Sequence, residues 1–375
     1  MAIQMVDLTG QYEKIQAEID TALLNVVKKG AFINGEEVKQ FSNSLSKYLN
    51  VPFVIPCANG TDALQISLMA LGLQPGDEVI VPSFTYVATA EVICLLKLKP
   101  VMVDVDPHSF NMSVSAMRDA MSIKTKAIMP VHLFGQCVDM EPLLEIANEF
   151  GLFIIEDCAQ AIGAKYSFSN GETKQAGTMG NIGCTSFFPS KNLGCFGDGG
   201  AIYTRDKSLA DKIRMIANHG QEKKYIHKYI GVNSRLDTIQ AAVLNVKLMY
   251  LNEYILARQK AAEIYDKLFS ELNTVIVPHR SSSSTHVFHQ YTLQIKNNKR
   301  SELKNYLGQE GIPSMIYYPI PMNKQEAFNK RSRVCGNLLN TKYLCSSVLS
   351  LPMHTELSEE QQVYLANILK SFFNK

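Results

Sequence analysis

Several features that mark other classes of protein are missing from this 375-residue sequence. Its formal net charge is only +2, so no excess of basic residues points to nucleic acid as a partner. No run approaches the roughly 18 uncharged apolar residues of a membrane span, and the first residues lack the charged start and long apolar core of a secretory signal. We therefore expect neither nucleic acid nor a membrane as a partner.

Nucleotide-binding and metal-binding signatures are absent as well. No Walker lysine pattern and no Gly-x-Gly-x-x-Gly opens a helical segment, which argues against the usual NTPase and dinucleotide sites. The eight cysteines form no C-x-x-C pair, and several lie in apolar runs, so we expect reduced thiols in a cytoplasmic enzyme. His286 and His289 lack the i, i+4 spacing and the nearby carboxylate of a helical metal site, so no metal is expected.

The most informative residue that is present is Lys191, which lies among small and apolar residues in the run Cys184–Gly200. An ammonium group among apolar neighbours loses hydration, so its pKa falls and the amine becomes a better nucleophile. That state suits a Schiff base with an aldehyde cofactor. A lone lysine of this kind is more often a loop residue beside a buried strand, so the hypothesis depends on companion residues.

One companion is Asp157, which ends the apolar run Phe153–Asp157 that is typical of a buried strand. Pyridoxal phosphate needs a carboxylate near its ring nitrogen, because a protonated pyridinium withdraws the electrons released at the substrate carbon. Gln160 could reach the 3-oxygen of that ring if the chain turns there. The alternative is that Asp157 only caps a following helix.

A second companion is the run Asn59-Gly60-Thr61, which follows an apolar segment and precedes a helical pattern. Small residues at a helix start leave backbone N–H groups free, and the helix dipole favours an anion there. Thr61 adds a hydroxyl group, so this run is a candidate phosphate site. An ordinary capped helix would show the same pattern.

Phosphate site, ring carboxylate and lysine occur in the order expected of a pyridoxal-phosphate enzyme. The order of these motifs and the residues within them resemble those of the DegT-type nucleotide-sugar aminotransferases. These enzymes have the aspartate-aminotransferase-like fold of type I pyridoxal-phosphate enzymes. The resemblance covers nearly the whole chain. Further matching runs are Val6–Leu8, Gly35–Val38, Pro82–Thr89, His219–Gln221, Asn233–Asp237, Tyr318–Pro321 and Ser350–His354.

The resemblance implies a role for individual residues. Lys191 and Asp157 would be the catalytic residues. In the resembling enzymes an aromatic residue at the position of Tyr86 stacks on the cofactor ring, and an asparagine matching Asn233 reaches the phosphate from the neighbouring subunit. A homodimer with shared active sites is therefore expected. The residues expected to bind pyridoxal 5'-phosphate are Gly60, Thr61, Tyr86, Asp157, Gln160, Ser186, Lys191 and Asn233.

The resemblance also implies a reaction, in which L-glutamate gives its amino group to a keto nucleotide-sugar. The runs 59–65, 186–191 and 318–325 look most like enzymes that aminate C3 of UDP-2-acetamido-2-deoxy-3-keto-glucuronate for O-antigen synthesis. Such a sugar carries a carboxylate that needs cationic or hydrogen-bonding partners.

The expected substrate contacts are Arg235 first, then Tyr318. Tyr317 is a weaker candidate, because it stands where the resembling enzymes often have histidine. His219 belongs to a basic, polar run that reads either as a solvated loop or as a loop near an anionic substrate.

Other functions remain open from the sequence. The alternative substrate is a dTDP-linked 3- or 4-keto-6-deoxyhexose, which has no carboxylate. Some relatives act as dehydratases without the lysine, and Lys191 argues against that activity. A non-catalytic regulatory protein that binds the cofactor is the alternative of a different class, although no basic segment resembles a nucleic-acid-binding region.

Alternating apolar and helical patterns predict an α/β protein with a mostly parallel central sheet and helices on both faces. We expect a large cofactor-binding domain over residues 1–245 and a smaller C-terminal α/β domain over residues 246–375. A long helical stretch from about 238 to 272 should join them, with small-domain strands at Tyr291–Ile295 and Met315–Tyr317. The strands expected in the large sheet are Phe53–Pro56, Glu78–Val81, Val101–Val105, Ala127–Val131, Phe153–Glu156, Cys184–Phe188 and Ala201–Thr204.

Overall fold

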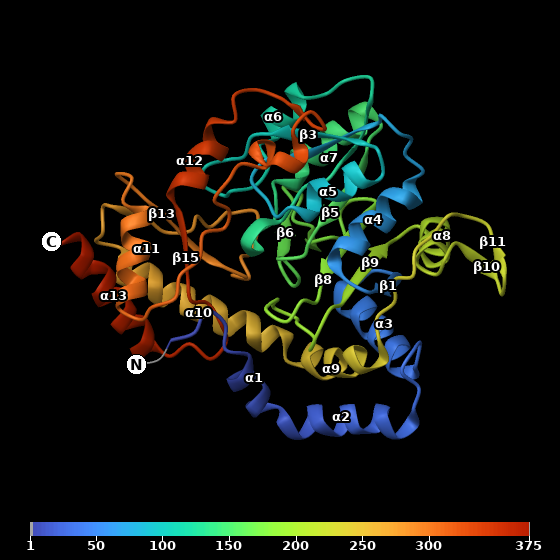
Figure 1. Ribbon diagram of the computed structural model, residues 1–375, viewed down its shortest axis with the longest axis horizontal. Coiled ribbons are helices and arrows are strands. Elements are labelled where there is room, and N and C mark those ends of the chain that lie inside the picture. Colours follow the sequence, from blue (N-terminus) through green and yellow to red (C-terminus); the bar gives the residue numbers. More distant parts are fainter. Residues whose placement is uncertain (1–2, 375) are drawn as a thin grey trace.

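The computed structural model describes residues 3–374 and is built around an eight-stranded sheet that lies between two layers of helices (Figure 1). The strand order is β1-β9-β8-β5-β4-β2-β3-β14. Neighbouring strands are parallel except at β9, which is antiparallel to both β1 and β8. The strands are β1 (Phe53–Cys57), β2 (Glu78–Pro82), β3 (Lys99–Val103), β4 (Thr125–Ile128), β5 (Phe153–Asp157), β8 (Ile182–Ser186), β9 (Gly200–Thr204) and β14 (Arg333–Val334).

Both faces of this sheet are apolar, as expected for parallel strands covered by helices. On β2, Ile80 belongs to the core on one face, whereas Val79 and Val81 belong to the core on the other. The first core receives side chains from α3 (Glu36–Leu49), α6 (Val114–Asp119), α7 (Met140–Phe150) and α9 (Thr238–Met249), and the second from α4 (Gly60–Leu71), α5 (Ala88–Leu95) and α8 (Lys207–Ala217). The predicted fold class, a mostly parallel α/β sheet, is confirmed.

A separate core lies around a three-stranded antiparallel sheet of β12 (Val275–Ile276), β13 (Tyr291–Ile295) and β15 (Val348–Leu351). The long helix α10 (Leu251–Phe269) runs from the large sheet toward this smaller one, and α11 (Arg300–Gln309) and α13 (Glu359–Phe373) complete it (Figure 1). The domain boundary at residue 245 stays a prediction. The chain beyond it also supplies β14 to the edge of the large sheet.

Two predicted segments differ from the structure. Met315–Tyr317 is not a strand, because only Met315 pairs, in a single bridge with Ser350 of β15. The stretch expected as one long helix from 238 to 272 is two helices, α9 and α10, separated at Tyr250.

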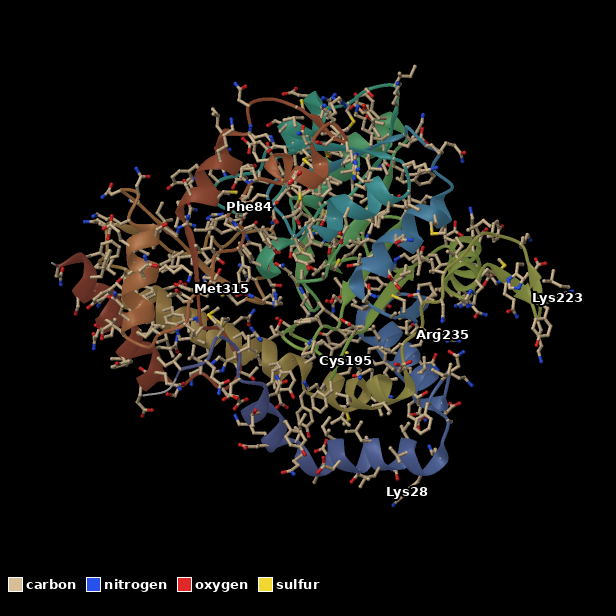
Figure 2. The ribbon with its side chains drawn as sticks, in the orientation of Figure 1. Lys28, Phe84, Cys195, Lys223, Arg235 and Met315 are labelled. Atoms are coloured by element: carbon tan, nitrogen blue, oxygen red, sulfur yellow. The ribbon has the colours of Figure 1, made fainter. Side chains whose placement is uncertain are left out.

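The remaining elements lie around these two cores. A hairpin of β10 (Gln221–Lys223) and β11 (Ile226–His227) projects away from the large sheet, with Lys223 on it (Figures 1 and 2). No helix within residues 3–374 is long and apolar enough to cross a membrane. The other helices and strands are α1 (Leu8–Lys14), α2 (Gln16–Lys29), β6 (Lys165–Ser167), β7 (Thr173–Gln175) and α12 (Leu339–Ser347), with short 3-10 turns at Leu133–Gly135, Met322–Lys324 and Glu326–Phe328.

Candidate active site

A cavity of about 750 Å³ lies where β5 and β8 end and α4 begins. This is the edge of a parallel sheet at which ligands of α/β proteins usually bind. Many of the residues singled out in the sequence come together on its wall. They are Gly60, Thr61, Tyr86, Asp157, Gln160, Ser186, Lys191, Tyr317 and Tyr318.

Lys191 reaches the cavity from the loop that joins β8 to β9. Its backbone N–H donates to the carbonyl oxygen of Phe188 at 2.8 Å, which forms a turn just after the strand. Desolvation lowers the pKa of Lys191 to about 8, and the nearby carboxylate of Asp157 acts in the opposite direction. The unprotonated share of this amine near neutral pH is therefore far larger than for an exposed lysine, and only that form acts as a nucleophile or a general base.

Asp157 ends β5 and is 6% exposed. Its Oδ2 accepts a hydrogen bond from the Thr89 hydroxyl at 3.0 Å, and its Oδ1 accepts one from the backbone N–H of Ala159 at 3.1 Å. Burial raises the pKa of Asp157, while these two donors and the charge of Lys191 partly oppose the shift. The carboxyl group is thus held in one orientation and can share a proton with a basic nitrogen placed in the cavity.

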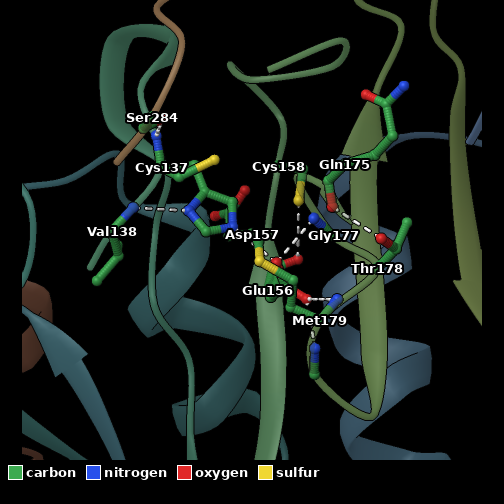
Figure 3. Close-up of polar contacts among 12 residues, drawn as sticks. Cys137, Val138, Glu156, Asp157, Cys158, Gln175, Gly177, Thr178, Met179 and Ser284 are labelled. Atoms are coloured by element: carbon green, nitrogen blue, oxygen red, sulfur yellow. Dashed lines mark hydrogen bonds and ion pairs between the residues drawn. The ribbon is translucent and has the colours of Figure 1, made fainter. Parts of the chain in front are cut away.

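A buried polar network lies beside Asp157 and fixes the end of β5 (Figure 3). The carboxylate of Glu156 accepts three backbone N–H groups of the turn 177–180 at 2.6–2.7 Å. It also lies 2.9 Å from Nε2 of His132. Because Nδ1 of His132 accepts the backbone N–H of Val138 at 3.0 Å, its ring proton must lie on Nε2 and point to Glu156. The carboxylate next to Asp157 is therefore fully hydrogen-bonded.

His132, Glu156 and Cys158 lie close enough together to be considered as metal ligands. The oxygens of Glu156 already accept four donors, and both nitrogens of His132 are engaged. Burial raises the pKa of the Cys158 thiol well above its usual value, which disfavours the thiolate that a metal would bind. We therefore interpret His132, Glu156 and Cys158 as a structural cluster.

The start of α4 forms the other end of the cavity. Asn59 caps the helix by accepting the backbone N–H of Asp62 at 2.8 Å. A Cβ atom on Gly60 would lie 2.7 Å from Cβ of Ser186, so only glycine lets the first turn of α4 approach the end of β8 this closely. Helix N-terminus, Thr61 hydroxyl and Ser186 hydroxyl thus border one space, which suits a phosphate group.

The remaining wall contains fixed polar and aromatic side chains. Gln160 accepts the backbone N–H of Phe134 at 2.8 Å through Oε1 and donates to the Tyr318 hydroxyl at 3.1 Å through Nε2. The ring of Tyr86, which is 57% exposed, lies 6.3 Å from that of Tyr318. An aromatic face, a phosphate site, a buried carboxylate and a lysine of lowered pKa are the contacts that pyridoxal phosphate needs, so these residues fit that cofactor.

Three predicted residues lie elsewhere on the single chain. Asn233, Arg235 and His219 are not among the residues that line the cavity within the described part of the chain. Asn233 and His219 are exposed, and His219 lies two residues before the first strand of the projecting hairpin. Arg235 is half-buried and lies on the side of the molecule from which that hairpin extends (Figure 2).

Other residues on the cavity wall had no role assigned from the sequence. Thr85 lines the cavity, and its hydroxyl lies 3.2 Å from that of Thr89, a buried residue outside the wall that donates to Asp157. No spacing in the sequence links Thr89 to Asp157. His289 was considered only as a metal ligand, yet it lies on the wall together with Gln290. Burial and the charge of Lys191 lower the pKa of His289 well below its usual value, so its imidazole is neutral.

Comparisons with known proteins agree with this geometry. The sequence profile of the DegT/DnrJ/EryC1/StrS aminotransferase family matches residues 13–370. The chain is 44% identical to a pleiotropic regulatory protein of Geobacillus stearothermophilus, over 100% of this chain and 99% of that one. It is also 44% identical to the UDP-2-acetamido-2-deoxy-3-oxo-D-glucuronate aminotransferase of Pseudomonas aeruginosa, over 95% and 96% of the two chains.

Similarity to solved structures extends over the whole chain. The crystal structure of Streptomyces venezuelae DesV in complex with a ketimine intermediate superposes with a TM-score of 0.94 at 34% sequence identity. The superposition covers 100% of this chain and 99% of DesV.

Proposed function

The chain belongs to the DegT/DnrJ/EryC1/StrS aminotransferase family, and from this premise we propose that it transfers an amino group from L-glutamate to a keto nucleotide-sugar. The acceptor that we favour is UDP-2-acetamido-2-deoxy-3-keto-D-glucuronate, and the product is its 3-amino sugar. The observation that carries the proposal is the meeting of Lys191, Asp157 and the N-terminus of α4 in one cavity.

The cofactor is pyridoxal 5'-phosphate. When bound, it carries the amino group between donor and acceptor and stabilises negative charge at the donor's α-carbon. We assign the phosphate to Gly60, Thr61 and Ser186, and the ring nitrogen to Asp157. Tyr86 would lie against the face of the ring, and Gln160 would contact its 3-oxygen.

We assign the proton transfers to Lys191. Its amine would hold the cofactor through the aldehyde group until the amino group of the donor takes its place. Once free, the amine would take a proton from the α-carbon of glutamate and give one to C4′ of the cofactor, and in the sugar half-reaction it would move a proton from C4′ to C3 of the sugar. A pKa near 8 suits both directions of this transfer, because the amine is neither firmly protonated nor a weak base.

We propose that the active site is completed in a homodimer, by Asn233 and Arg235 of a second copy. Both residues lie outside the cavity of their own chain. Apolar side chains are also exposed on the second half of α2 and just after it, where Leu24 and Val27 are each 55% exposed, Phe32 46% and Ile33 49%. A cluster of exposed apolar groups favours association with another surface.

The sugar assignment rests on similarity and on the chemistry of the candidate contacts. The Pseudomonas aeruginosa relative acts, by its name, on the oxo-glucuronate sugar. We propose Arg235 as the partner of the sugar's carboxylate, with Tyr318 and Tyr317 as contacts within the cavity and His219 as a contact near the hairpin. We also propose a cytoplasmic location, which the eight free cysteines support, because thiols stay reduced in that compartment.

A panel of keto nucleotide-sugars assayed with L-glutamate tests the proposal. We expect the 3-keto-glucuronate derivative of UDP-N-acetylglucosamine to be the best acceptor, and 2-oxoglutarate to form in equal amount. Preferred turnover of a dTDP-linked 3- or 4-keto-6-deoxyhexose would favour the alternative acceptor instead.

We expect Arg235→Ala to impair the sugar half-reaction and largely to spare the glutamate half-reaction. The guanidinium fork fits a carboxylate, and losing such a charge-assisted contact costs roughly 1.5–3 kcal/mol, or about 10- to 100-fold. Stopped-flow absorbance can follow each half-reaction separately. Equal losses in both would point to a structural role for Arg235.

A regulatory role is the second candidate, because the Geobacillus stearothermophilus relative is named a regulatory protein. A protein that only binds the cofactor would not convert it to the amino form when L-glutamate is added. We expect that conversion to occur, visible as a change in cofactor absorbance. Its absence in the cofactor-loaded protein would favour regulation.

A further inference from the structure

Two backbone hydrogen bonds stabilise the loop that carries Lys191. The backbone N–H of Phe187 donates to the carbonyl of Gly199 at 2.7 Å, and that of Cys195 donates to the carbonyl of Phe187 at 2.8 Å. The first bond joins the two ends of the loop, where it leaves β8 and enters β9, and the second joins Cys195, within the loop, to its start. They do not connect the segment around Lys191 to the opposite wall of the cavity.

Asn192, the next residue along the chain, makes that connection. Its side chain is 3% exposed, and its Nδ2 donates to the carbonyl oxygen of Val287 at 2.8 Å. Its Oδ1 is buried without a hydrogen-bond partner in the described part of the chain. The position of this buried amide therefore depends on one hydrogen bond, between residues 95 positions apart.

The acceptor of this bond is itself firmly held. Val287 is fully buried and lies two residues before His289, which lines the cavity. The guanidinium of Arg258, on α10, donates to the carbonyl oxygens of Phe288 at 3.1 Å and Met353 at 2.9 Å. Through Asn192, the loop that carries the lysine is attached to a wall that is anchored to α10.

We propose that Asn192 is a positioning residue that holds the amine of Lys191 in its desolvated place between Asp157 and His289. The inference builds on the role proposed above for Lys191. Among the described residues, the groups with an electrostatic effect on that amine or from it are the carboxylate of Asp157 on β5 and the neutral imidazole of His289. The other titratable side chains on the cavity wall are Asp62, Tyr86, Asp198, Tyr317 and Tyr318. Without the hydrogen bond between Asn192 and Val287, the loop shifts and water reaches the ammonium group. The pKa of Lys191 then returns toward that of an exposed lysine.

The test measures the ionisation of Lys191 without turnover. The full-length protein in its pyridoxamine-phosphate form, in which the lysine is free, is acetylated with acetic anhydride over a range of pH. The extent of labelling is read on the peptide that contains Lys191. We expect Asn192→Leu, which keeps the branched four-atom side-chain skeleton and removes the donor, to raise the pKa of Lys191 by about one unit. Asn192→Ser, too short to reach Val287, should act in the same direction.

Asn340→Leu is the matched control. Its Nδ2 donates to the carbonyl oxygen of Val105 at 2.8 Å, away from the cavity. The melting temperature should fall in the variants of both Asn192 and Asn340. The pH profile of Lys191 labelling should change only in the Asn192 variants. Turnover should fall there by about 10- to 100-fold, since small misplacements of reacting groups are that costly. An unchanged Lys191 profile in both Asn192 variants would overturn the proposal, whatever the protein's substrate is.

Discussion

Replacing Lys191 with alanine is expected to abolish transamination, with a loss of at least about 10⁴-fold, the upper end of what one acid–base group contributes. The amine of Lys191 both binds the cofactor's aldehyde and moves the proton, and no other lysine lines the cavity within the described residues. The fold and part of the cofactor affinity should survive, because the start of α4, Ser186 and Asp157 are unchanged. Single-turnover absorbance with L-glutamate measures the loss, and circular dichroism checks the fold.

Lys247 provides a matched control for this variant. It is 2% exposed and its pKa is also lowered to about 8 by desolvation, but it lies on α9 and does not line the cavity. Its ammonium lies 4.9 Å from the ring centroid of Phe196. Lys247→Met should therefore keep the glutamate half-reaction. Retained transamination in Lys191→Ala, or an equal loss in Lys247→Met, would contradict the role given to Lys191.

Asp157→Asn is expected to slow the chemical step by several orders of magnitude, while it weakens cofactor binding much less. A neutral amide cannot keep the ring nitrogen protonated, so the negative charge that develops at the donor's α-carbon loses its electron sink. One unit of pKa mismatch corresponds to about 1.4 kcal/mol, or tenfold in rate, and several units are at stake. Stopped-flow rates and the cofactor dissociation constant separate the two effects.

Asp104 offers a comparison for this second variant. It follows the end of β3, and its carboxylate accepts hydrogen bonds from the backbone N–H and the hydroxyl of Thr341, both at 2.8 Å. Asp104→Asn should lower the melting temperature and leave the rate nearly unchanged. A near-native rate in Asp157→Asn would show that a different group serves the ring nitrogen.

The strand ending in Asp157 could be predicted because an apolar run before a carboxylate is a local pattern. The same holds for the helix that starts at Gly60. The prediction of a strand at Met315–Tyr317 was wrong, because apolar residues alone do not show whether a neighbouring strand edge is available for pairing. β14 was not predicted, since two residues, Arg333 and Val334, carry too little pattern.

Contacts between distant parts of the chain could not be foreseen. Thr89 and Asp157 are 68 positions apart, and Asn192 and Val287 are 95 apart, so no spacing in the sequence links them. Asn233 and Arg235 were predicted as binding residues from the resemblance to the aminotransferase family. Their place outside the cavity of one chain leaves their roles as predictions about a second copy.

Whether Lys191 holds the cofactor can be tested by reducing the cofactor-loaded protein with borohydride and mapping the labelled peptide by mass spectrometry. Reduction fixes the cofactor covalently to whichever amine holds it. We expect one labelled peptide, which carries the cofactor on Lys191. Labelling of a different lysine, or no covalent label on a protein that has bound the cofactor, would contradict it.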